Sequence, residues 1–298
     1  MTDSLHTTAH HLIARVWGEE ATGRLIADRR GTCLWRVEAR SGPYALKITV
    51  PCTDPQGHVE SERLALVEAE VLTAMGPVAP PGLYQGHGLL PGGPAAGSWL
   101  ALRWVRGEDA ETAFAKLRPS PNRAAAASYA AAMCEAVADL HTGGWRHGDL
   151  QEVHFILDGT HAHLLDFAMA HAPDRTPGNG PVVYRGAYDW FMSPELAHAR
   201  LTTTPADDLP LTTASEVWSL CAVLYACWTG TYPISTRDTT QSTPELRAEL
   251  ARGQVKPLTS TRPWPFAAFE EIITSGLQID PARRPTARAL QHAFENLI

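Results

Sequence analysis

The sequence predicts an α+β protein in which a strand-rich first part precedes a mainly helical second part. Residues 22–50 form short apolar runs separated by turns, which is typical of an antiparallel meander. Beyond Gly107, apolar residues recur at helical spacing over long segments. Within that second part, Asp158-Gly159 separates two short apolar runs and predicts a tight hairpin. We therefore expect two domains, residues 1–105 and 106–298.

Composition and charge limit the class of protein and partner. The chain has 298 residues, of which 44% are hydrophobic and 19% charged, as in globular proteins. Its net charge of −7 argues against a nucleic acid or an anionic membrane as partner. The five cysteines form no C-x-x-C pair, and the longest apolar stretch, 217–229, is too short to span a bilayer. With no N-terminal signal pattern, a cytoplasmic location is expected.

The first elements are a short helix around residues 11–17 and three strands. Two of these strands lie within residues 22–39 and are joined by a loop at 28–32. The third strand covers residues 44–50 and carries Lys47. Lysine is rare here, with three residues (Lys47, Lys116 and Lys256) among 25 Lys and Arg. Because Arg is the usual cation in this chain, a lysine within an apolar strand indicates that this position requires the chemistry of lysine.

Residues 58–75 are predicted to form a helix with one apolar face. Five apolar side chains recur at helical spacing, namely Leu64, Val67, Val71, Leu72 and Met75. Glu68 falls on the same face, where a carboxylate is costly to desolvate unless it is paired. Lys47 is its nearest chemically sensible partner. The alternative is that Glu68 marks the solvated edge of the apolar face.

The remaining elements follow from the same patterns. Strands are expected within residues 77–97 and over 98–105. Helices are predicted over four segments, 122–141, 213–229, 264–277 and 286–297. The helix at 213–229 is apolar on nearly every face and is therefore expected to be buried. Residues 169–190 show no periodicity and are predicted to form a long loop.

The hairpin predicts a site. Its strands would be residues 155–157 and 162–165, and an antiparallel pair brings its outer ends together. His154 should therefore lie beside Asp166, with the loop carrying Asp149 next to both. Two carboxylates and an imidazole form a plausible site for a metal ion and for proton transfer. A solvated loop that happens to carry polar residues is the alternative.

Three segments, in this order and spacing, resemble motifs of the protein kinase family. Tyr44-Ala45-Leu46-Lys47 resembles the third-strand V-A-I-K motif. His147-Gly148-Asp149-Leu150 resembles the catalytic loop H-R-D-L, and Asp166-Phe167-Ala168 resembles D-F-G. The resemblance covers the chain from about residue 22 to its end. It implies a bilobal fold with an ATP-binding N-terminal lobe of antiparallel strands plus one helix, and a mainly helical catalytic C-terminal lobe.

The resemblance also implies roles for the matching residues. Lys47 would hold the α- and β-phosphates of ATP and pair with Glu68, and Asp166 would bind Mg²⁺. Asp149 would accept or orient the proton of the substrate hydroxyl group. Residues 100–107 resemble the hinge that contacts adenine. The nucleotide-binding residues expected on this basis are Lys47, Gly31, Leu102, Arg103 and Val105, and the catalytic ones are Asp149, Lys47, Glu68 and Gln151.

Three C-terminal motifs extend the resemblance. Ser193-Pro194-Glu195 resembles A-P-E, and residues 280–286 resemble D-P-x-x-R-P-T, whose Arg, here Arg284, pairs with the A-P-E acid. Residues 214–219 resemble the S-D-V-W-S start of the central buried helix, with Glu216 in place of Asp. These motifs build the platform on which protein kinases dock peptides.

Several departures from the family pattern affect the expected chemistry. His154 replaces the Asn that binds a second metal ion, and because imidazole suits softer ions than Mg²⁺, Mn²⁺ is an alternative metal. The glycine-rich loop is reduced to Gly31, where Arg29 or Arg30 could contribute positive charge. Gly148 replaces the Arg that normally pairs with a phosphate on the activation loop, so we expect no such switch. Gln151 and Ala168 replace the usual Lys and Gly.

The sequence leaves three functions open. The first is an ATP-dependent kinase for a Ser or Thr hydroxyl group of a protein or peptide. A narrower form is a bacterial peptide-modifying kinase, because H-G-D-L resembles the phosphorylating domains of lanthipeptide-type synthetases. The second is a small-molecule phosphotransferase similar to aminoglycoside or choline kinases. The third is a pseudokinase that acts as a scaffold, which the departures at His154 and Ala168 favour.

Overall fold

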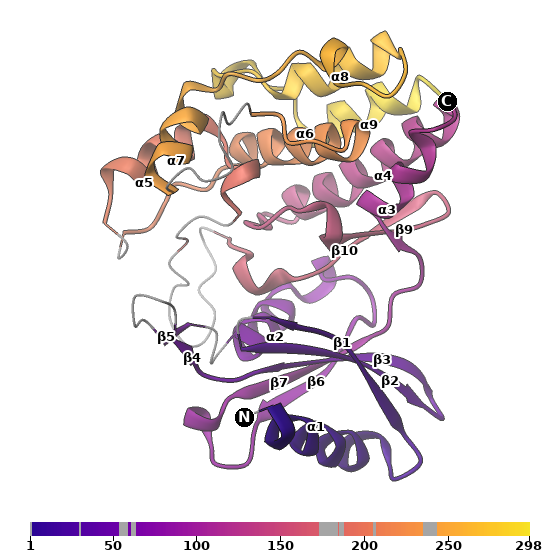
Figure 1. The fold of residues 1–298 in the computed structure, drawn as a ribbon, viewed down its shortest axis with the longest axis vertical. Coiled ribbons are helices and arrows are strands. Elements are labelled where there is room, and N and C mark those ends of the chain that lie inside the picture. Colours follow the sequence, from indigo (N-terminus) through magenta and orange to yellow (C-terminus); the bar gives the residue numbers. More distant parts are fainter. Residues whose placement is uncertain are drawn as a thin grey trace. The chain divides into compact units, whose positions relative to one another are not determined.

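The computed structural model describes residues 2–29, 31–53, 59–60, 64–172, 184, 188–204, 207–234 and 243–298. The chain divides into two compact units, Met1–Val105 and Arg106–Ile298 (Figure 1). Antiparallel strands dominate the first unit and helices dominate the second. The predicted α+β class is therefore confirmed.

A five-stranded antiparallel sheet organises the first unit. Its spatial order is β1-β2-β3-β7-β6. The strands are β1 (Thr22–Arg29), β2 (Thr32–Ala39), β3 (Gly42–Thr49), β6 (Tyr84–Leu89) and β7 (Ser98–Arg103). A separate small sheet pairs β4 (Cys52–Thr53) with β5 (Val59–Glu60). The meander predicted over residues 22–50 and the strand predicted at 98–105 are confirmed.

Two helices cover this sheet, α1 (Thr2–Trp17) on one face and α2 (Leu64–Met75) on the other (Figure 1). The alternating pattern of β2 buries three side chains against the apolar face of α1, in a core that includes Cys33, Trp35, Val37, Ala9, Leu12 and Ile13. The approach is close, because a Cβ atom at Gly23 would collide with Cδ1 of Ile13. The sheet that carries Lys47 is thus supported from both sides.

Two predicted helix boundaries in this unit are wrong. The first helix begins at Thr2 rather than near residue 11, because its mostly polar first turns still bury Ala9 and partly bury Leu5. The second begins at Leu64 rather than at residue 58, and Val59–Glu60 pairs as a strand instead. His58, at the predicted start, lies outside the described residues.

Helices are the main elements of the second unit. They are α3 (Ala110–Leu117), α4 (Arg123–Thr142), α5 (Pro194–Thr202), α6 (Thr213–Thr229), α7 (Thr243–Arg252), α8 (Ala267–Gly276) and α9 (Ala287–Glu295). The helix α6 is buried along nearly its whole length, with Trp218 and Trp228 each 1% exposed. Figure 1 shows it among α4, α8 and α9. The four predicted helices are confirmed, whereas α3, α5 and α7 were not predicted.

A small sheet in this unit carries the central hairpin. The hairpin consists of β9 (Phe155–Asp158) and β10 (His161–Leu164), with Asp158 paired to His161, and β8 (Glu108–Asp109) adds to its edge. Gly159 has a φ of 62°, which its lack of a Cβ atom permits. The Asp-Gly hairpin predicted from the sequence is confirmed.

The described residues include no membrane-spanning helix and four buried cysteines. No helix there is both long and apolar enough to cross a bilayer. Cys33, Cys134, Cys221 and Cys227 are free and buried. Burial raises the pKa of Cys221 to about 12, so its thiol stays protonated and unreactive near neutral pH.

Candidate active site

Lys47 and Glu68 form the polar centre of the first unit. The Nζ atom of Lys47, on β3, lies 2.8 Å from Oε2 of Glu68, on α2. Their side chains are 13% and 1% exposed, so the pair is largely removed from water. The predicted pairing of Glu68 with Lys47 is confirmed, and the alternative of a solvated glutamate is wrong. A lysine held in this way presents a fixed, partly accessible ammonium group.

The turn at Gly31 is tight. Arg29 pairs with Thr32 across β1 and β2, which leaves only residue 30, outside the described residues, and Gly31 between them. Gly31 has a φ of 74°, and its carbonyl oxygen accepts a hydrogen bond from the Val50 amide at 2.8 Å. Gly31 therefore has a left-handed backbone conformation, and its carbonyl oxygen is hydrogen-bonded to the residue that follows β3.

The three predicted adenine-contacting residues lie at the end of the first unit. Leu102 is buried in β7, and Arg103, next to it, is exposed and donates its amide to the Leu83 carbonyl at 2.7 Å. Val105 is half-buried after the strand. Their role in nucleotide binding stays a prediction.

In the second unit, the hairpin brings His154 beside Asp166. The Leu165 amide donates to the His154 carbonyl at 2.9 Å and closes the open end of the hairpin. The Nε2 atom of His154 then lies 3.7 Å from Oδ2 of Asp166, and Nδ1 lies 4.0 Å from Oδ2 of Asp149. The convergence of these three side chains, predicted from the turn, is confirmed.

One hydrogen bond sets the tautomer of His154. Its Nδ1 atom lies 2.8 Å from the backbone carbonyl oxygen of Asp149, which can only accept. Nδ1 therefore carries a proton, and in the neutral ring Nε2 is the atom with the free lone pair. This lone pair points to the side of the ring where the Asp166 carboxylate lies.

One oxygen atom of the Asp149 carboxylate is fixed by a hydrogen bond from a neighbouring side chain. The Gln151 amide donates to Oδ1 of Asp149 at 2.7 Å. The Asp149 side chain is 19% exposed, so the carboxylate is not fully buried. Gln151, which replaces the usual Lys, thus orients the carboxylate without adding charge.

Asp166 has an unusual backbone conformation. It is the only non-glycine residue with a positive φ in the described part of the chain, at φ 65° and ψ 68°. The next residue, Phe167, begins a short 3₁₀ turn and is 1% exposed. Such strain persists where the surroundings enforce it, and it concentrates at functional sites.

His147 ties the catalytic loop to this turn. Its Nε2 atom donates to the Leu165 carbonyl at 2.9 Å, and Nδ1 faces the Asp149 amide at 3.3 Å. Burial lowers the pKa of His147, and the neighbouring His154 lowers it further. The ring is therefore a neutral structural link rather than an acid.

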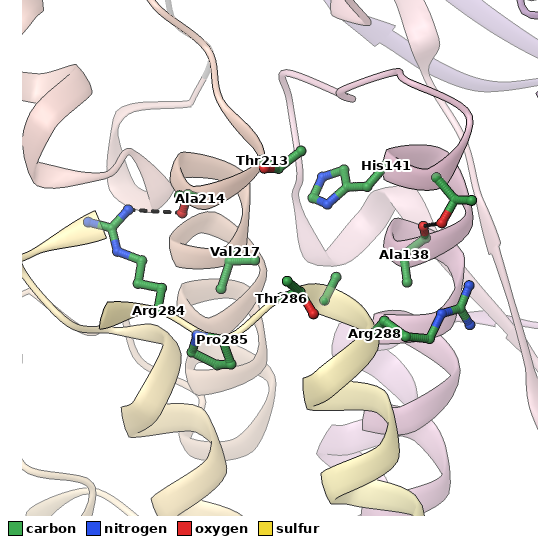
Figure 2. A pocket seen from close by; sticks show the side chains of 11 residues that line it. Ala138, His141, Thr213, Ala214, Val217, Arg284, Pro285, Thr286 and Arg288 are labelled. Atoms are coloured by element: carbon green, nitrogen blue, oxygen red, sulfur yellow. Dashed lines mark hydrogen bonds between the residues drawn. The ribbon is translucent and has the colours of Figure 1, made fainter. Parts of the chain in front are cut away.

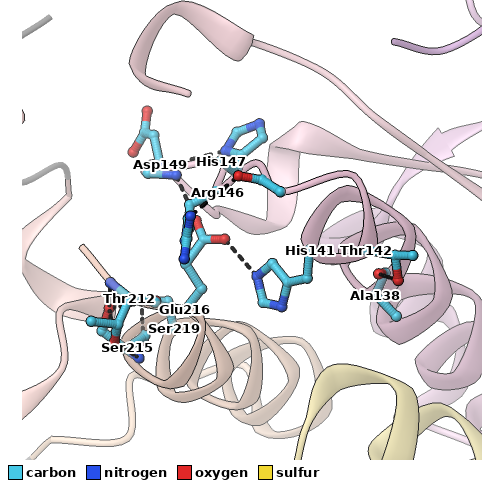
Figure 3. Close-up of polar contacts among 12 residues, drawn as sticks. Ala138, His141, Thr142, Arg146, His147, Asp149, Thr212, Ser215, Glu216 and Ser219 are labelled. Atoms are coloured by element: carbon cyan, nitrogen blue, oxygen red, sulfur yellow. Dashed lines mark hydrogen bonds and ion pairs between the residues drawn. The ribbon is translucent and has the colours of Figure 1, made fainter. Parts of the chain in front are cut away.

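Glu216 holds the catalytic loop from α6 (Figure 3). Its Oε1 atom accepts the Gly148 amide at 2.6 Å, and Oε2 lies 2.8 Å from Nε2 of His141. Burial acts to raise the pKa of Glu216, but the hydrogen bond and charge of His141 and the Gly148 amide outweigh it and leave the pKa lowered. Glu216 is therefore a buried, charged anchor for the loop.

Glu216 lies in the first turn of α6, and the N-terminus of this helix is capped. Thr212 and Ser215 form a reciprocal capping box at its start, at 3.0 Å and 2.9 Å. His141, at the end of α4, was not predicted as part of this anchor. No local pattern around His141 indicates its contact with Glu216, which joins residues 75 positions apart.

The predicted pairing of Arg284 with Glu195 is confirmed. The guanidinium group makes two hydrogen bonds to the carboxylate, at 2.6 and 2.8 Å, and its side chain is 0% exposed. It also donates to the Ala214 carbonyl at 2.9 Å, beside a pocket of about 360 Å³ that is also lined by His141 (Figure 2). Arg284 thus joins α5, α6 and the turn before α9.

The donor atoms fit a divalent ion that is bound partly by the protein and partly by a substrate. Within the described residues no group of three or more His, Cys, Asp or Glu side chains could hold a metal ion alone. Asp166 and the Nε2 lone pair of His154 offer two ligands. Mg²⁺ in phosphoryl-transfer sites is usually bound by one or two carboxylates together with substrate phosphates and water. The pair therefore suits a nucleotide-bound ion.

Comparisons with known proteins identify the family of the chain. Residues 98–294 match the family model described as protein kinase domain. The chain is 29% identical over 208 residues to the serine/threonine-protein kinase RUNKEL of Arabidopsis thaliana. That alignment covers 67% of this chain but only 14% of the plant protein.

The fold is also similar to that of a solved kinase. The crystal structure of the Rad53 kinase domain and SCD2 in complex with AMPPNP superposes with a TM-score of 0.58 at 18% identity. The match covers 91% of this chain and 88% of the other, which establishes a kinase-like fold. Since the family model also spans more than half of the chain, the protein belongs to the protein kinase family as a eukaryotic-like protein kinase.

Proposed function

We propose that the protein transfers the γ-phosphoryl group of ATP to a Ser or Thr hydroxyl group of a protein or peptide. The observation that carries this proposal is the convergence of Asp149, His154 and Asp166 at the open end of one hairpin. Family membership adds the expectation of ATP as the donor, and the solved relative contains the ATP analogue AMPPNP.

In this proposal, each polar side chain has one task. Oδ2 of Asp149 accepts or orients the proton of the attacking hydroxyl group, while Gln151 holds Oδ1. Lys47 contacts the α- and β-phosphates, and Glu68 keeps its ammonium group in place. Little covalent chemistry is required of the protein, since phosphoryl transfer depends on positioning and on neutralising charge.

Asp166 and His154 would hold the metal ion. A bound divalent ion neutralises the charge that develops on the phosphate oxygens. Imidazole nitrogen binds Mn²⁺ more readily than Mg²⁺, so we propose that the protein uses Mn²⁺ at least as well as Mg²⁺. Gly31, Leu102, Arg103 and Val105 are proposed to contact the nucleotide.

A macromolecular hydroxyl group is favoured over a small molecule. Arg284 joins Glu195 on α5 to the Ala214 carbonyl on α6, which is the arrangement expected of a peptide-docking platform. The plant relative is named a serine/threonine kinase. A peptide encoded near this protein is included as a candidate substrate, because the H-G-D-L loop resembles those of peptide-modifying enzymes.

The test is incubation with γ-labelled ATP and either Mg²⁺ or Mn²⁺, followed by mass spectrometry. Three acceptors are offered: the protein itself, a Ser/Thr peptide library, and a panel of aminoglycosides and choline. Phosphorylated Ser or Thr supports the proposal. Phosphorylation of small molecules alone would replace it with the small-molecule function, and nucleotide binding without transfer would indicate a scaffold.

A matched pair of variants links any transfer to Asp149. Asp149→Asn keeps the size of the side chain but removes the proton acceptor, so we expect the rate to fall by about 10²- to 10⁴-fold while nucleotide binding persists. Asp158→Asn changes an exposed carboxylate at the hairpin turn and should leave the rate unaltered. Equal rates for Asp149→Asn and the unaltered protein would remove Asp149 from the mechanism.

A further inference from the structure

A tyrosine between the Asp166 turn and α5 contacts the catalytic loop directly. The hydroxyl group of Tyr184 donates a hydrogen bond to the Gly148 carbonyl oxygen at 3.0 Å. Its side chain is buried, with the residue 4% exposed. The peptide bond that Tyr184 contacts is the one that joins Gly148 to Asp149.

The ring of Tyr184 packs against the position where a side chain of residue 148 would begin. Gly148 has a φ of 78°, a conformation that side-chain-bearing residues rarely adopt. A Cβ atom there would lie 2.5 Å from the Met169 carbonyl oxygen and 3.1 Å from Cε2 of Tyr184. Glycine is therefore required by this arrangement, and the absence of the family's Arg follows from it.

The backbone of Tyr184 is itself anchored. Its amide donates to Oδ1 of Asp208 at 2.6 Å, and its carbonyl oxygen accepts the Leu209 amide at 2.8 Å. Leu209 is 2% exposed and lies shortly before the capped start of α6. Tyr184 is thus fixed to the same part of the chain from which Glu216 reaches the loop.

Gly148 is consequently held at both of its polar groups. Glu216 accepts from its amide, and Tyr184 donates to its carbonyl oxygen. In kinases that carry an Arg at this place, a phosphate added to the activation loop pairs with the Arg and orders the segment. Here a neutral, buried hydrogen bond makes the corresponding link between that segment and the loop.

We propose that Tyr184 is a positioning residue that fixes Asp149 for catalysis without any phosphate on the activation segment. The inference rests on the proposed phosphotransfer function and goes beyond it, because it states how the active loop is held. The Tyr184 hydroxyl is buried and already donates to Gly148, so in this state it is not an acceptor for a modifying kinase.

The test compares Tyr184→Phe with Tyr225→Phe. Both remove the hydroxyl group of a buried tyrosine, but Tyr225 bonds to Oγ1 of Thr261 and not to the loop. In Tyr184→Phe we expect kcat to fall by about fivefold, the loss that corresponds to one hydrogen bond of about 1 kcal/mol, with KM for ATP unchanged. Tyr225→Phe should retain the kcat of the unaltered protein.

Hydrogen exchange supplies a readout that does not depend on activity. Amides of residues 147–152 should exchange faster in Tyr184→Phe than in Tyr225→Phe, with exchange in α8 and α9 equal in both. Unaltered exchange at 147–152 would overturn the proposal. If no acceptor is phosphorylated by the unaltered protein, the proposed function fails, and the exchange experiment still decides whether Tyr184 holds the loop.

Phosphatase treatment tests the independence from phosphate. The protein is treated with a broad-specificity phosphatase, its phosphate content is checked by mass spectrometry, and its initial rate is measured on a peptide. An unchanged rate supports the proposal. A rate that falls with loss of phosphate from the segment between Asp166 and Ser193 would overturn it.

Discussion

The Nε2 atom of His154 lies 3.7 Å from Oδ2 of Asp166, while Nδ1 of the same ring is bonded to the Asp149 carbonyl oxygen at 2.8 Å. In the neutral ring, a nitrogen lone pair therefore faces a carboxylate, which is an arrangement of two acceptors. Such a pair is stabilised by a cation between the two groups or by a proton on the ring. This relationship makes the metal preference of the site testable.

Replacing the histidine should change that preference. In His154→Asn, a carboxamide oxygen takes the place of the nitrogen, so the ratio of Mn²⁺ to Mg²⁺ affinity should fall by about tenfold. Mn²⁺ binding in the presence of a non-hydrolysable ATP analogue can be followed by electron paramagnetic resonance, with Mg²⁺ as competitor. His161→Asn, at an exposed position of β10, is the control. Identical metal profiles for His154→Asn and the control would show that His154 is not a ligand.

Loss of Lys47 should affect stability as well as nucleotide use. Lys47→Met leaves the Glu68 carboxylate, 1% exposed, without its ammonium partner, and removing one member of such a pair typically costs about 3–5 kcal/mol. Urea unfolding measures this loss. The double variant Lys47→Met/Glu68→Leu also removes the buried charge and should regain much of the stability. Equal stability of the single and double variants would contradict the pairing.

An exposed ion pair provides the comparison for Lys47. Arg40 and Glu20 lie 2.9 Å apart with side chains 88% and 81% exposed. Solvent and salt screen such pairs, so Arg40→Met should leave the free energy of unfolding nearly unchanged. Nucleotide affinity, measured by calorimetry, should fall in Lys47→Met and stay constant in Arg40→Met.

Because of Glu216, the free energy of unfolding should depend on pH in the acid range. Because the folded protein lowers its pKa below the ordinary value of 4.5, the unfolded chain takes up the proton at higher pH. The stabilising contribution is fully present above pH 4.5 and is lost as the pH falls through the lower folded value. The difference in unfolding free energy between the unaltered protein and Glu216→Gln should therefore shrink below pH 4.5.

Urea unfolding at several pH values checks this behaviour. Near neutral pH, Glu216→Gln should be less stable by about 3 kcal/mol, since it removes the charged partner of His141 from a buried site. A stability difference that stays constant from neutral pH down to the acid range would mean that Glu216 is not charged in the folded protein.

Substitution of Arg284 should lower the stability of the second unit more than substitution at most other positions. Its guanidinium group bonds to Glu195 and to three backbone carbonyl groups, those of Ala214, Gln278 and Ile279. Lysine cannot reproduce this planar set of donors, so Arg284→Lys should lower the unfolding free energy by about 2–4 kcal/mol. Arg288→Lys is the control, because its bond to Asp139 is largely solvent-exposed. Similar melting temperatures of the two variants would refute a special role for Arg284.

Much of the fold could be predicted because its signals are local. The Asp158-Gly159 turn and the apolar surface of α6 each lie within one segment, and the structure has both where the sequence indicated. The missed helix α7 and the missed start of α1 lack such signals. The helix α7 is rich in charged residues, and the first turns of α1 are mostly polar, so their burial depends on partners distant in the chain.

The same difference between local and long-range signals applies to the candidate site. The positions of Lys47, Glu68 and the three side chains at the hairpin could be predicted from periodicity and from the antiparallel turn. Gly148 could be noted only as a missing arginine. Its positive φ and the contact with Tyr184 arise from a long-range arrangement that no local pattern encodes.

The backbone at Gly148 limits how this protein could be brought under phosphate control. Introducing an arginine there would need not one substitution but a new path for the chain, because even the first carbon of its side chain would collide with the Met169 carbonyl oxygen. An engineered on–off version would have to act at position 184 instead, for example with a caged tyrosine that light restores. The glycine at position 148 thus determines at which position of the chain control of activity could be engineered.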